Sequence, residues 1–378
     1  MATSSRPSTS RPKPGRGWRP KVAGRAGCRA GFRLVFALLI LTSGCTLWER
    51  AAPAPGTATV PNSATTAFDD KLAAPPTPTP EEGTPATAPR MPERVWVAVE
   101  GAGILALVDL TTRQVVEQHP AGPGPHNLAV GRDGTVAACL YGGDGIAIVR
   151  NGAVATVALG GRPHDVKPDD RGGFVVTNEA ARRVEVIGSD GRLGPQIQLR
   201  AEPHDLDLTP DGRAAWVTLN GTGELALVDL DRGVVSRYVP TWQRPHDVRV
   251  APDGSIWLTD WDGPLHVLTA DGQPVESIPL GLEAHHLAFT PDGSQLWVAD
   301  HATREAYVVD TTSREVLAEL PLPGAPHHVA VTADGALVAI ADHSNGALLV
   351  FDAARHQYLA TIPVGPGPHG VWALPPPG

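Results

Sequence analysis

The chain has 378 residues, a formal net charge of −9, 42% hydrophobic residues and only 5% aromatic residues. Its 41 Gly and 38 Pro favour short strands and turns over long helices. Residues 1–44 hold nine of the 31 Lys/Arg and none of the 40 Asp/Glu, so the remainder carries a net charge of −18. A body this acidic repels a phosphate backbone, which excludes nucleic acid as an expected partner.

The N-terminus has the layout of a secretory signal. A basic segment precedes a short apolar run, Leu34 to Leu41, and then Thr42-Ser-Gly-Cys45. This ending resembles the lipobox of bacterial lipoproteins, although Thr42 stands where the lipobox usually has Leu. The resemblance implies that residues 1–44 are removed, that Cys45 is lipidated, and that the protein is extracytoplasmic and held to the membrane by its lipid alone. Secretion without lipidation is the alternative.

Residues 46–92 contain ten Pro among mostly Ala, Thr and Gly. They offer too little apolar surface to offset the conformational entropy of folding. We expect residues 45–92 to be a disordered linker and residues 93–378 to form the folded body.

The body is built from a repeat. A Pro or Ala is followed by His in seven places, with spacings of 38, 40, 42, 39, 42 and 42 residues: His126, His164, His204, His246, His285, His327 and His369. A period near 40 indicates a repeat architecture. In one repeat we predict strands at 204–209, 214–219, 224–230 and 234–239, with the first two joined by a turn at Asp211-Gly212. Four antiparallel strands in about 40 residues are typical of a propeller blade.

Counting strands predicts how the propeller closes. The body opens with three strands only, at 95–99, 104–110 and 114–118, and ends with one spare strand at 369–374. Six complete repeats lie between them. We therefore predict an all-β, seven-bladed propeller of four-stranded antiparallel blades, whose first blade is completed by the C-terminal strand. We expect it to be a monomer.

Two strand motifs carry a family resemblance. Phe174-Val-Val-Thr-Asn178 and Trp257-Leu-Thr-Asp260 resemble the second strand of the YVTN, or YncE-like, bacterial β-propellers. Leu105-Ala-Leu-Val-Asp109 resembles their third strand. The resemblance implies the fold, but these propellers bind or transform unrelated ligands, so it does not fix a function.

The seven histidines predict a polar ring at one mouth of the central channel, because first strands line the channel of a propeller. Neutral imidazoles suit copper, zinc or iron, so the leading hypothesis is a site for a transition metal or a small ligand. If the histidines face the channel, alternation turns the next residues toward neighbouring blades. Either set could form the ring; the second set is Asn127, Asp165, Asp205, Asp247, His286, His328 and Gly370. A purely structural role in joining blades is the alternative for all seven histidines.

Other resemblances suggest other functions. The propeller of nitrous oxide reductase is similar to this body and holds a copper cluster with histidines, but its binuclear copper domain has no counterpart here. Residues 255–260 resemble repeats of streptogramin lyases and propeller lactonases, which implies a metal-assisted hydrolase or lyase. The candidate catalytic residues for that reaction are Asp300, His301, Asp342 and His343. A scaffold that binds a protein partner is the third hypothesis.

Overall fold

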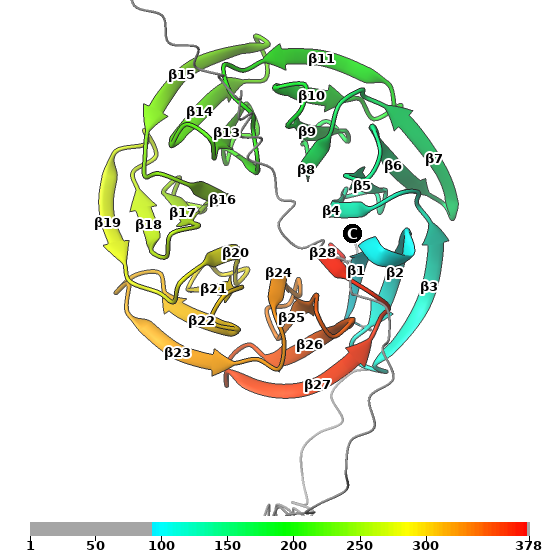
Figure 1. Cartoon of the computed structure of the whole chain (residues 1–378), viewed down its shortest axis with the longest axis vertical. Helices are drawn as coiled ribbons and strands as arrows, with labels where there is room; N and C mark the ends of the chain where they lie inside the picture. The colour runs from blue at the N-terminus through cyan, green and yellow to red at the C-terminus, as the bar shows by residue number, and fades with distance from the viewer. Residues whose placement is uncertain (1–92, 376–378) are drawn as a thin grey trace, which may run out of the picture. The chain divides into compact units, whose positions relative to one another are not determined.

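The computed structural model describes residues 93–375. The expected signal peptide, Cys45 and the expected linker fall outside these residues. Residues 93–375 form β-strands and one short 3-10 helix, η1 (Glu100–Ala102), and this part of the chain has no helix with the length and apolarity to span a membrane. The strands form seven four-stranded antiparallel sheets arranged around a centre (Figure 1). The predicted propeller is confirmed.

The first four blades follow the chain in order. Blade 1 contains β28 (Pro368–Ala373), β1 (Arg94–Val99), β2 (Ile104–Asp109) and β3 (Gln114–Pro120). Blade 2 contains β4 (Pro125–Val130), β5 (Val136–Leu140), β6 (Gly145–Arg150) and β7 (Ala153–Ala158). Blade 3 contains β8 (Pro163–Pro168), β9 (Phe174–Asn178), β10 (Arg183–Ile187) and β11 (Leu193–Gln198). Blade 4 contains β12 (Leu206–Leu208), β13 (Ala214–Leu219), β14 (Glu224–Asp229) and β15 (Val234–Pro240).

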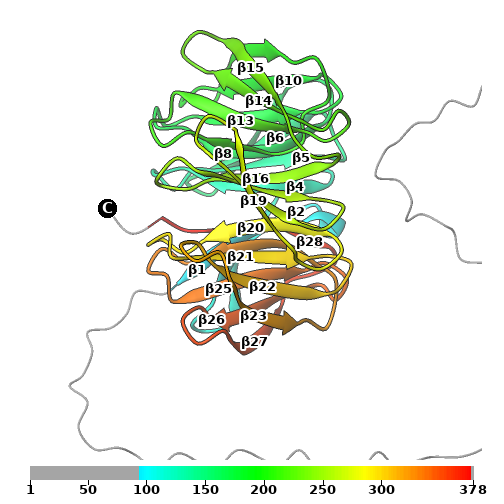
Figure 2. The same cartoon turned by 90° about the vertical axis from the view of Figure 1, so that its left-hand side faces the viewer.

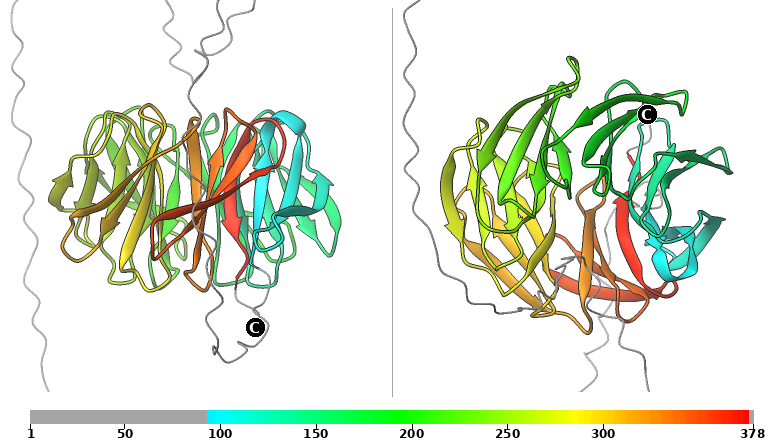
Figure 3. Two further views of the ribbon diagram at one scale, coloured as in Figure 1. Left: turned by 90° about the horizontal axis from the view of Figure 1, so that it is seen from below. Right: turned by 45° about the horizontal axis from the view of Figure 1, so that its top comes forward.

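The last three blades repeat the arrangement. Blade 5 contains β16 (Pro245–Val250), β17 (Ile256–Asp260), β18 (Leu265–Leu268) and β19 (Pro274–Ile278). Blade 6 contains β20 (Ala284–Phe289), β21 (Gln295–Asp300), β22 (Glu305–Asp310) and β23 (Val316–Pro321). Blade 7 contains β24 (Pro326–Val331), β25 (Leu337–Asp342), β26 (Ala347–Asp352) and β27 (Gln357–Pro363). The first strand of each blade is innermost, and the strands run between the two faces of the disc (Figures 2 and 3).

One hydrophobic cluster fills each interface between neighbouring blades. Alternation along β1 shows how: Val95 and Val97 pack against blade 7, whereas Trp96 and Ala98 pack against blade 2. Both faces of a blade are thus apolar because successive side chains point to opposite sides of the sheet. The stability of the disc resides in these interfaces, so no blade can be expected to fold alone.

The C-terminal strand closes the ring as predicted. β28 pairs with β1 in antiparallel register, with Val95 opposite Ala373 and Trp96 opposite Trp372. The amide of Leu374 also donates to the carbonyl of Arg94 at 3.0 Å. The first and last strands of the body therefore share one sheet, which removes the open edge that β1 would otherwise expose.

A β-bulge lies at the entry of each innermost strand. In β16, Pro245 pairs with Asp260 and Val248 with Leu258, so His246 and Asp247 together oppose only Thr259. The same two-against-one pairing occurs at His126, His164, His285, His327 and His369. In blade 4, the His204 amide donates to the Thr218 carbonyl and the Thr218 amide to the Asp205 carbonyl. The regular strand then starts only at Leu206, so the prediction of a strand from residue 204 was wrong.

Candidate metal centre

The seven repeated histidines form a closed ring of imidazoles, which we call the histidine ring. From blade to blade, starting at His126, the centroids of successive rings are 4.8, 3.8, 4.4, 4.1, 4.5 and 4.2 Å apart, and 3.5 Å separates His369 from His126. Six of the seven are buried, with His246 only 1% exposed, and His327 is partly buried. The structure brings together the seven histidines that the repeat singled out. Their role in binding metal stays a prediction.

Most members of the histidine ring are neutral imidazoles. Burial lowers the pKa of His246, His285, His327 and His369 well below the usual value, and neighbouring histidines lower it further. Nδ1 of His285, His327 and His369 is buried and has no hydrogen-bond partner among residues 93–375. Unpaired buried imidazole nitrogens are costly in a fold but are the donors that late transition metals take. The residues present therefore fit a metal ion.

The residues after the histidines form a second tier: Asn127, Asp165, Asp205, Asp247, His286, His328 and Gly370. Strict alternation predicted that only one of the two sets could face the channel. The bulge removes that choice, because it inserts an extra residue at the strand entry. Asn127 reaches Asp205, two blades away, at 3.3 Å, and also Asp165 at 3.2 Å. Asp165 in turn accepts the amide of Leu206 in the next blade at 3.0 Å, so the second tier both borders the channel and joins blades.

Asp205 is the hub of the second tier. Its buried carboxylate lies 3.2 Å from Nδ1 of His164 and 3.3 Å from Nδ1 of His204. Although burial opposes ionisation, these two neighbours hold the pKa of Asp205 well below its usual range. Burial alone would lower the pKa of His164, but the charges of Glu179 and Asp205 raise it to about 9. His164 is therefore a cation at neutral pH, unlike the neutral part of the ring.

We predict that the charge on His164 makes stability fall at alkaline pH. Its folded-state pKa of about 9 lies above the ordinary value of 6.5, so its ion pairs stabilise the fold fully below pH 6.5. This contribution, on the order of 3 kcal/mol, is lost as the pH rises through about 9. Urea unfolding of chelator-treated protein from pH 6 to pH 9.5 measures the slope. His164→Gln should make the slope shallower without removing it, because burial raises the pKa of Asp247 to about 8 and this carboxyl also titrates in the range. An unchanged slope in that variant contradicts the assignment.

Threonines hold three of the bulges in place. Thr177, Thr218 and Thr259 lie opposite the bulges of blades 3, 4 and 5, and each hydroxyl accepts the amide of the second-tier aspartate at 2.9 Å. Each hydroxyl also donates to the carbonyl of the ring histidine in the next blade, at 2.6, 2.8 and 2.7 Å. Where the second tier holds no aspartate, the opposing residue is Cys139, Ala299, Ala341 or Ala98. Threonine and aspartate therefore occur together as an inter-blade bridge.

Thr218→Val should destabilise the protein by about 1–3 kcal/mol, although valine has nearly the same shape. The change leaves the buried Asp205 amide without its hydroxyl acceptor and removes a donor from the His246 carbonyl. The free energy of urea unfolding at constant pH measures the loss. Thr222→Val is the matched control, because its hydroxyl bonds Glu224 on the exposed surface, and we expect it to change stability by less than ~0.5 kcal/mol. Equal effects of the two changes would contradict the bridge.

A third set of residues surrounds the entrance above the histidine ring. Each is the first residue after the second strand of its blade, and we call the set the mouth ring: Glu100, Tyr141, Glu179, Asn220, Trp261, His301 and His343. Sequence analysis had not singled out Tyr141, which stacks on His126 with ring centroids 4.6 Å apart. The sequence could have identified Tyr141, because its position directly after the second strand of its blade is enough to define the set.

The mouth ring is acidic on one side and basic or aromatic on the other. Glu100 lies 3.3 Å from Nδ1 of His126, and Glu179 lies 3.9 Å from Nε2 of both His164 and His204. Across the ring, the imidazoles of His301 and His343 each lie 4.8 Å from that of His327. This asymmetry means that a bound ligand would meet carboxylates at one edge and imidazoles at the other.

The structure separates the two histidines proposed for catalysis from their aspartates. His301 and His343 direct Nδ1 at the carbonyls of Pro326 and Pro368, at 3.2 and 3.3 Å. A carbonyl only accepts, so Nδ1 carries a proton, and in the neutral imidazole Nε2 then keeps its lone pair. Asp300 instead accepts the amides of Leu282 and Glu283, and Asp342 accepts the Asn345 amide and side chain, so both carboxylates hold loops. They are structural here, because loop donors occupy their oxygens.

Among residues 93–375, three groups of side chains that include ring histidines could hold a metal ion. In each group, one ligand atom per residue lies within 4.8 Å of the others: His246 with His285 and His286, Glu100 with His126 and His369, and His164 with His204 and Asp205. The third group contains the cation His164, which disfavours a metal. The first is made of buried imidazoles alone, and His285 Nδ1 and His286 Nε2 have no partner among residues 93–375. Of the three groups, this one is best suited to bind a metal ion.

Comparison with known proteins supports the fold assignment. Residues 265–376 match the family described as YNCE-like beta-propeller, in agreement with the resemblance seen in the strand motifs. No curated protein sequence matches the chain.

Several solved structures share the propeller. Hydrazine synthase of Kuenenia stuttgartiensis superposes with a TM-score of 0.61 at 19% identity, covering 66% of this chain and 89% of that one. Virginiamycin B lyase of Staphylococcus aureus gives a TM-score of 0.57 at 17% identity, covering 64% and 84%. Dihydro-heme d1 dehydrogenase NirN gives 0.55 at 16% identity, covering 76% and 77%. At these identities the likeness extends to the fold alone, and any function must be argued from the site.

Proposed function

We propose that this propeller binds a transition metal ion in its histidine ring, with His246, His285 and His286 as the leading ligands. The observation that carries the proposal is the closed ring of buried imidazoles, several of whose nitrogens have no partner among residues 93–375. A fold can use one buried histidine as a bridge, but unpaired donors repeated around a ring need a ligand to offset their desolvation.

The donor chemistry selects the class of metal. Imidazole nitrogen suits copper, zinc and iron, whereas calcium and magnesium prefer oxygen donors. The His246 group has three such nitrogens, all buried. Nδ1 of His246 lies 3.3 Å from the carbonyl of His285, which fixes its proton there and leaves Nε2 free to coordinate. Copper, zinc or iron is therefore the proposed cofactor.

The test is metal retention by the purified protein. Separate samples are loaded with Cu(II), Zn(II), Fe(II) or Mg(II), dialysed, and measured by elemental analysis. We expect at least one equivalent of a late transition metal to remain and magnesium to be lost. Loss of all four ions overturns the proposal.

A second candidate function uses the same mouth. His301 and His343 each present, beside His327, an Nε2 that makes no hydrogen bond within residues 93–375. A general base with a fixed tautomer is what proton abstraction requires. Metal-assisted opening of a cyclic ester, by hydrolysis or by elimination, fits this arrangement. Metal-loaded protein should then turn over a lactone or a streptogramin B antibiotic, and His301→Gln and His343→Gln should each slow the reaction. Absence of turnover with metal bound leaves binding as the function.

Two further proposals concern the setting of the protein. We place it outside the cytoplasm, anchored by lipid on Cys45, because the segment before that residue resembles a lipoprotein signal. Fractionation should find the protein with membranes and Cys45→Ser should release it. If the ring retains no metal, the acidic body is better explained as a scaffold for a protein partner, and the same purified protein can be used to search for one.

A further inference from the structure

The far end of the channel contains a cavity whose lining includes none of the seven ring histidines. Its volume is about 290 Å³. It is lined by residues near the C-terminal ends of the innermost strands, including Phe289 of β20, Val331 of β24 and Val371 of β28. The histidines lie at the opposite ends of these same strands. The cavity therefore opens away from the candidate metal centre.

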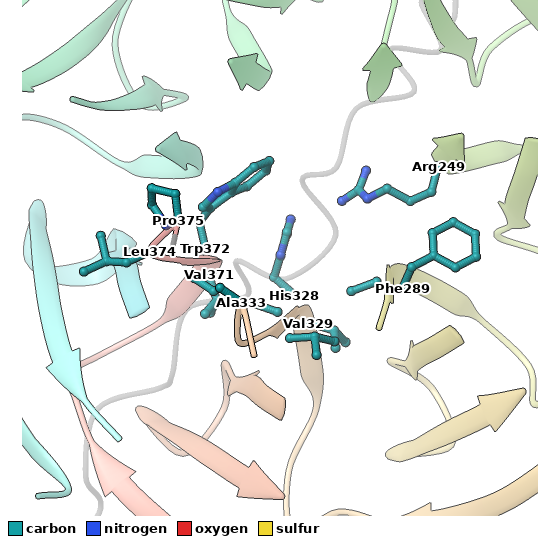
Figure 4. Close-up of a pocket in the computed structure, with 13 residues that line it drawn as sticks. Arg249, Phe289, His328, Val329, Ala333, Val371, Trp372, Leu374 and Pro375 are labelled. Atoms are coloured by element: carbon teal, nitrogen blue, oxygen red, sulfur yellow. The ribbon is translucent and has the colours of Figure 1, made fainter. Parts of the chain in front are cut away.

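Two polar side chains and an indole converge on this otherwise apolar cavity. The guanidinium of Arg249, the imidazole of His328 and the indole of Trp372 point into one space (Figure 4). His328 is 2% exposed, and its Nδ1 has no hydrogen-bond partner among residues 93–375. An unpaired buried nitrogen on the wall of a cavity indicates that a ligand group belongs there.

Arg249 has one edge committed and one edge free. Its Nη1 donates to Asp247 at 2.6 Å and to the Val248 carbonyl at 3.0 Å. Nε and Nη2 make no hydrogen bond to any group within residues 93–375. These two N–H groups form a planar fork whose geometry matches the two oxygens of a carboxylate. No acidic side chain lines the cavity, so the charge of the lining itself is positive.

The apolar walls restrict the rest of the ligand. Trp372 and Phe289 lie on two sides of this space (Figure 4), and Val331 and Val371 also line it. Lys167 lies with Nζ 5.8 Å from the centroid of the Trp372 ring and donates to Asp165 at 2.6 Å, so it holds the indole without entering the lining. A pocket with apolar walls and a few convergent polar groups is the usual form of a small-molecule site.

We propose that this cavity binds a small aromatic monocarboxylate. The carboxylate meets the Nε–Nη2 edge of Arg249 and Nδ1–H of His328, and the ring lies between Trp372 and Phe289. None of the proposed metal ligands lines this cavity, although His328 packs on His286 with ring centroids 4.3 Å apart. The site can therefore be filled in metal-free protein.

The test compares isosteric probes on the unaltered protein. Phenylacetate, its neutral analogue phenylacetamide, and acetate are titrated by calorimetry and by ligand-observed NMR. We expect phenylacetate to bind with a Kd of roughly 0.1–1 mM, the amide at least about tenfold more weakly, and acetate not measurably. Equal binding of acid and amide overturns the proposal, as does failure of phenylacetate to bind at 10-fold the upper value.

Variants locate the site. Arg249→Lys keeps the charge beside Asp247 but removes the fork, and should weaken phenylacetate binding about tenfold. Trp372→Leu should weaken phenylacetate binding similarly by removing an aromatic wall. Arg132→Lys is the matched control, because Arg132 is exposed and pairs with Asp170 at 2.8 Å on the surface. Binding unchanged in Arg249→Lys, or metal retention lost in that variant together with phenylacetate binding, contradicts a separate site.

Discussion

Ending the chain after Gly367 should abolish cooperative folding. The truncation removes β28, and with it the innermost strand of blade 1, the pairing partner of β1, and the side chains of Val371 and Trp372 from their interfaces. It also opens the histidine ring at His369. Domains of this kind are stable by only about 5–15 kcal/mol. Loss of the innermost strand of blade 1 and exposure of an unpaired edge should remove most of this free energy of unfolding. We therefore expect circular dichroism and gel filtration to show an unfolded or aggregated chain.

A circular permutant separates closure from mere shortening. The Leu374 amide donates to the Arg94 carbonyl, so the end of β28 already lies beside the start of β1. A chain that begins near residue 365, continues to residue 375 and joins residue 93 through a turn of about two to four residues makes a β-hairpin of these two strands. We expect the permutant, ending at residue 364, to unfold at nearly the urea concentration of the parent. If the truncated chain does so too, closure by β28 is not what stabilises the ring.

Replacing His285 and His286 together by Ala should weaken binding of a late transition metal at least about 100-fold. Both side chains belong to the ligand group best suited to bind a metal ion, and disruption of even an outer partner of a metal ligand typically costs 10- to 100-fold. Metal at 100 times its Kd also stabilises a folded protein by about 2.7 kcal/mol, and the double variant should lose this increment. Competition with a chromophoric chelator and thermal unfolding with and without metal measure the two effects.

His119→Ala is the matched control for this experiment. His119 also carries an imidazole near a carboxylate, Glu117 at 3.3 Å, but lies on the outer strand β3. We expect His119→Ala to retain the metal with unchanged affinity. If the double variant binds metal as the parent does, the ligands lie elsewhere in the ring, and the Glu100, His126 and His369 group is next to be changed.

Sequence patterns were sufficient for the architecture because they recur. A spaced His, an Asp-Gly turn and apolar alternation each appear blade after blade, so an error in one repeat is corrected by the others. In blade 4 the second strand was predicted at 214–219 and found as Ala214–Leu219. The Asp211-Gly212 turn is also present, since Gly212 has φ 65° and Asp211 accepts the Arg213 amide at 3.1 Å.

The candidate site was predicted less completely, for a reason that lies in the backbone. Period-two reasoning assigns adjacent residues to opposite sides, and the bulge at each histidine violates that rule. Sequence reasoning therefore placed either the histidines or the residues after them at the channel, whereas in the structure both sets border it. The Thr–Asp pairing across blades was visible in the sequence, but its meaning depends on which residues a bulge places opposite each other.

Individual side chains show the remaining limits. Asp300 and His301 are neighbours, yet one holds a loop and the other faces the channel, because the strand ends between them. Trp242 follows the last strand of blade 4 and stacks on His266 with centroids 3.4 Å apart in the interface of blades 4 and 5, so it packs between blades. Arg249 was not predicted to line a site, because a single arginine on a strand carries no sequence signal of a cavity.

The bulges also bear on how such a protein can change over generations. At each bulge, two residues lie opposite a single residue of the neighbouring strand. The strand pairing within the blade therefore does not depend on which side chain the second residue carries. The chain already varies this position among Asn, Asp, His and Gly while every blade keeps the same strand order. Gly370 marks the exception: an added Cβ would come within 2.5 Å of the His126 carbonyl oxygen where the ring closes. The other six positions hold a side chain, but a change at Asn127, Asp165 or Asp205 also breaks a hydrogen bond between blades. The lining of the channel can therefore vary most readily where the second tier makes no such bridge.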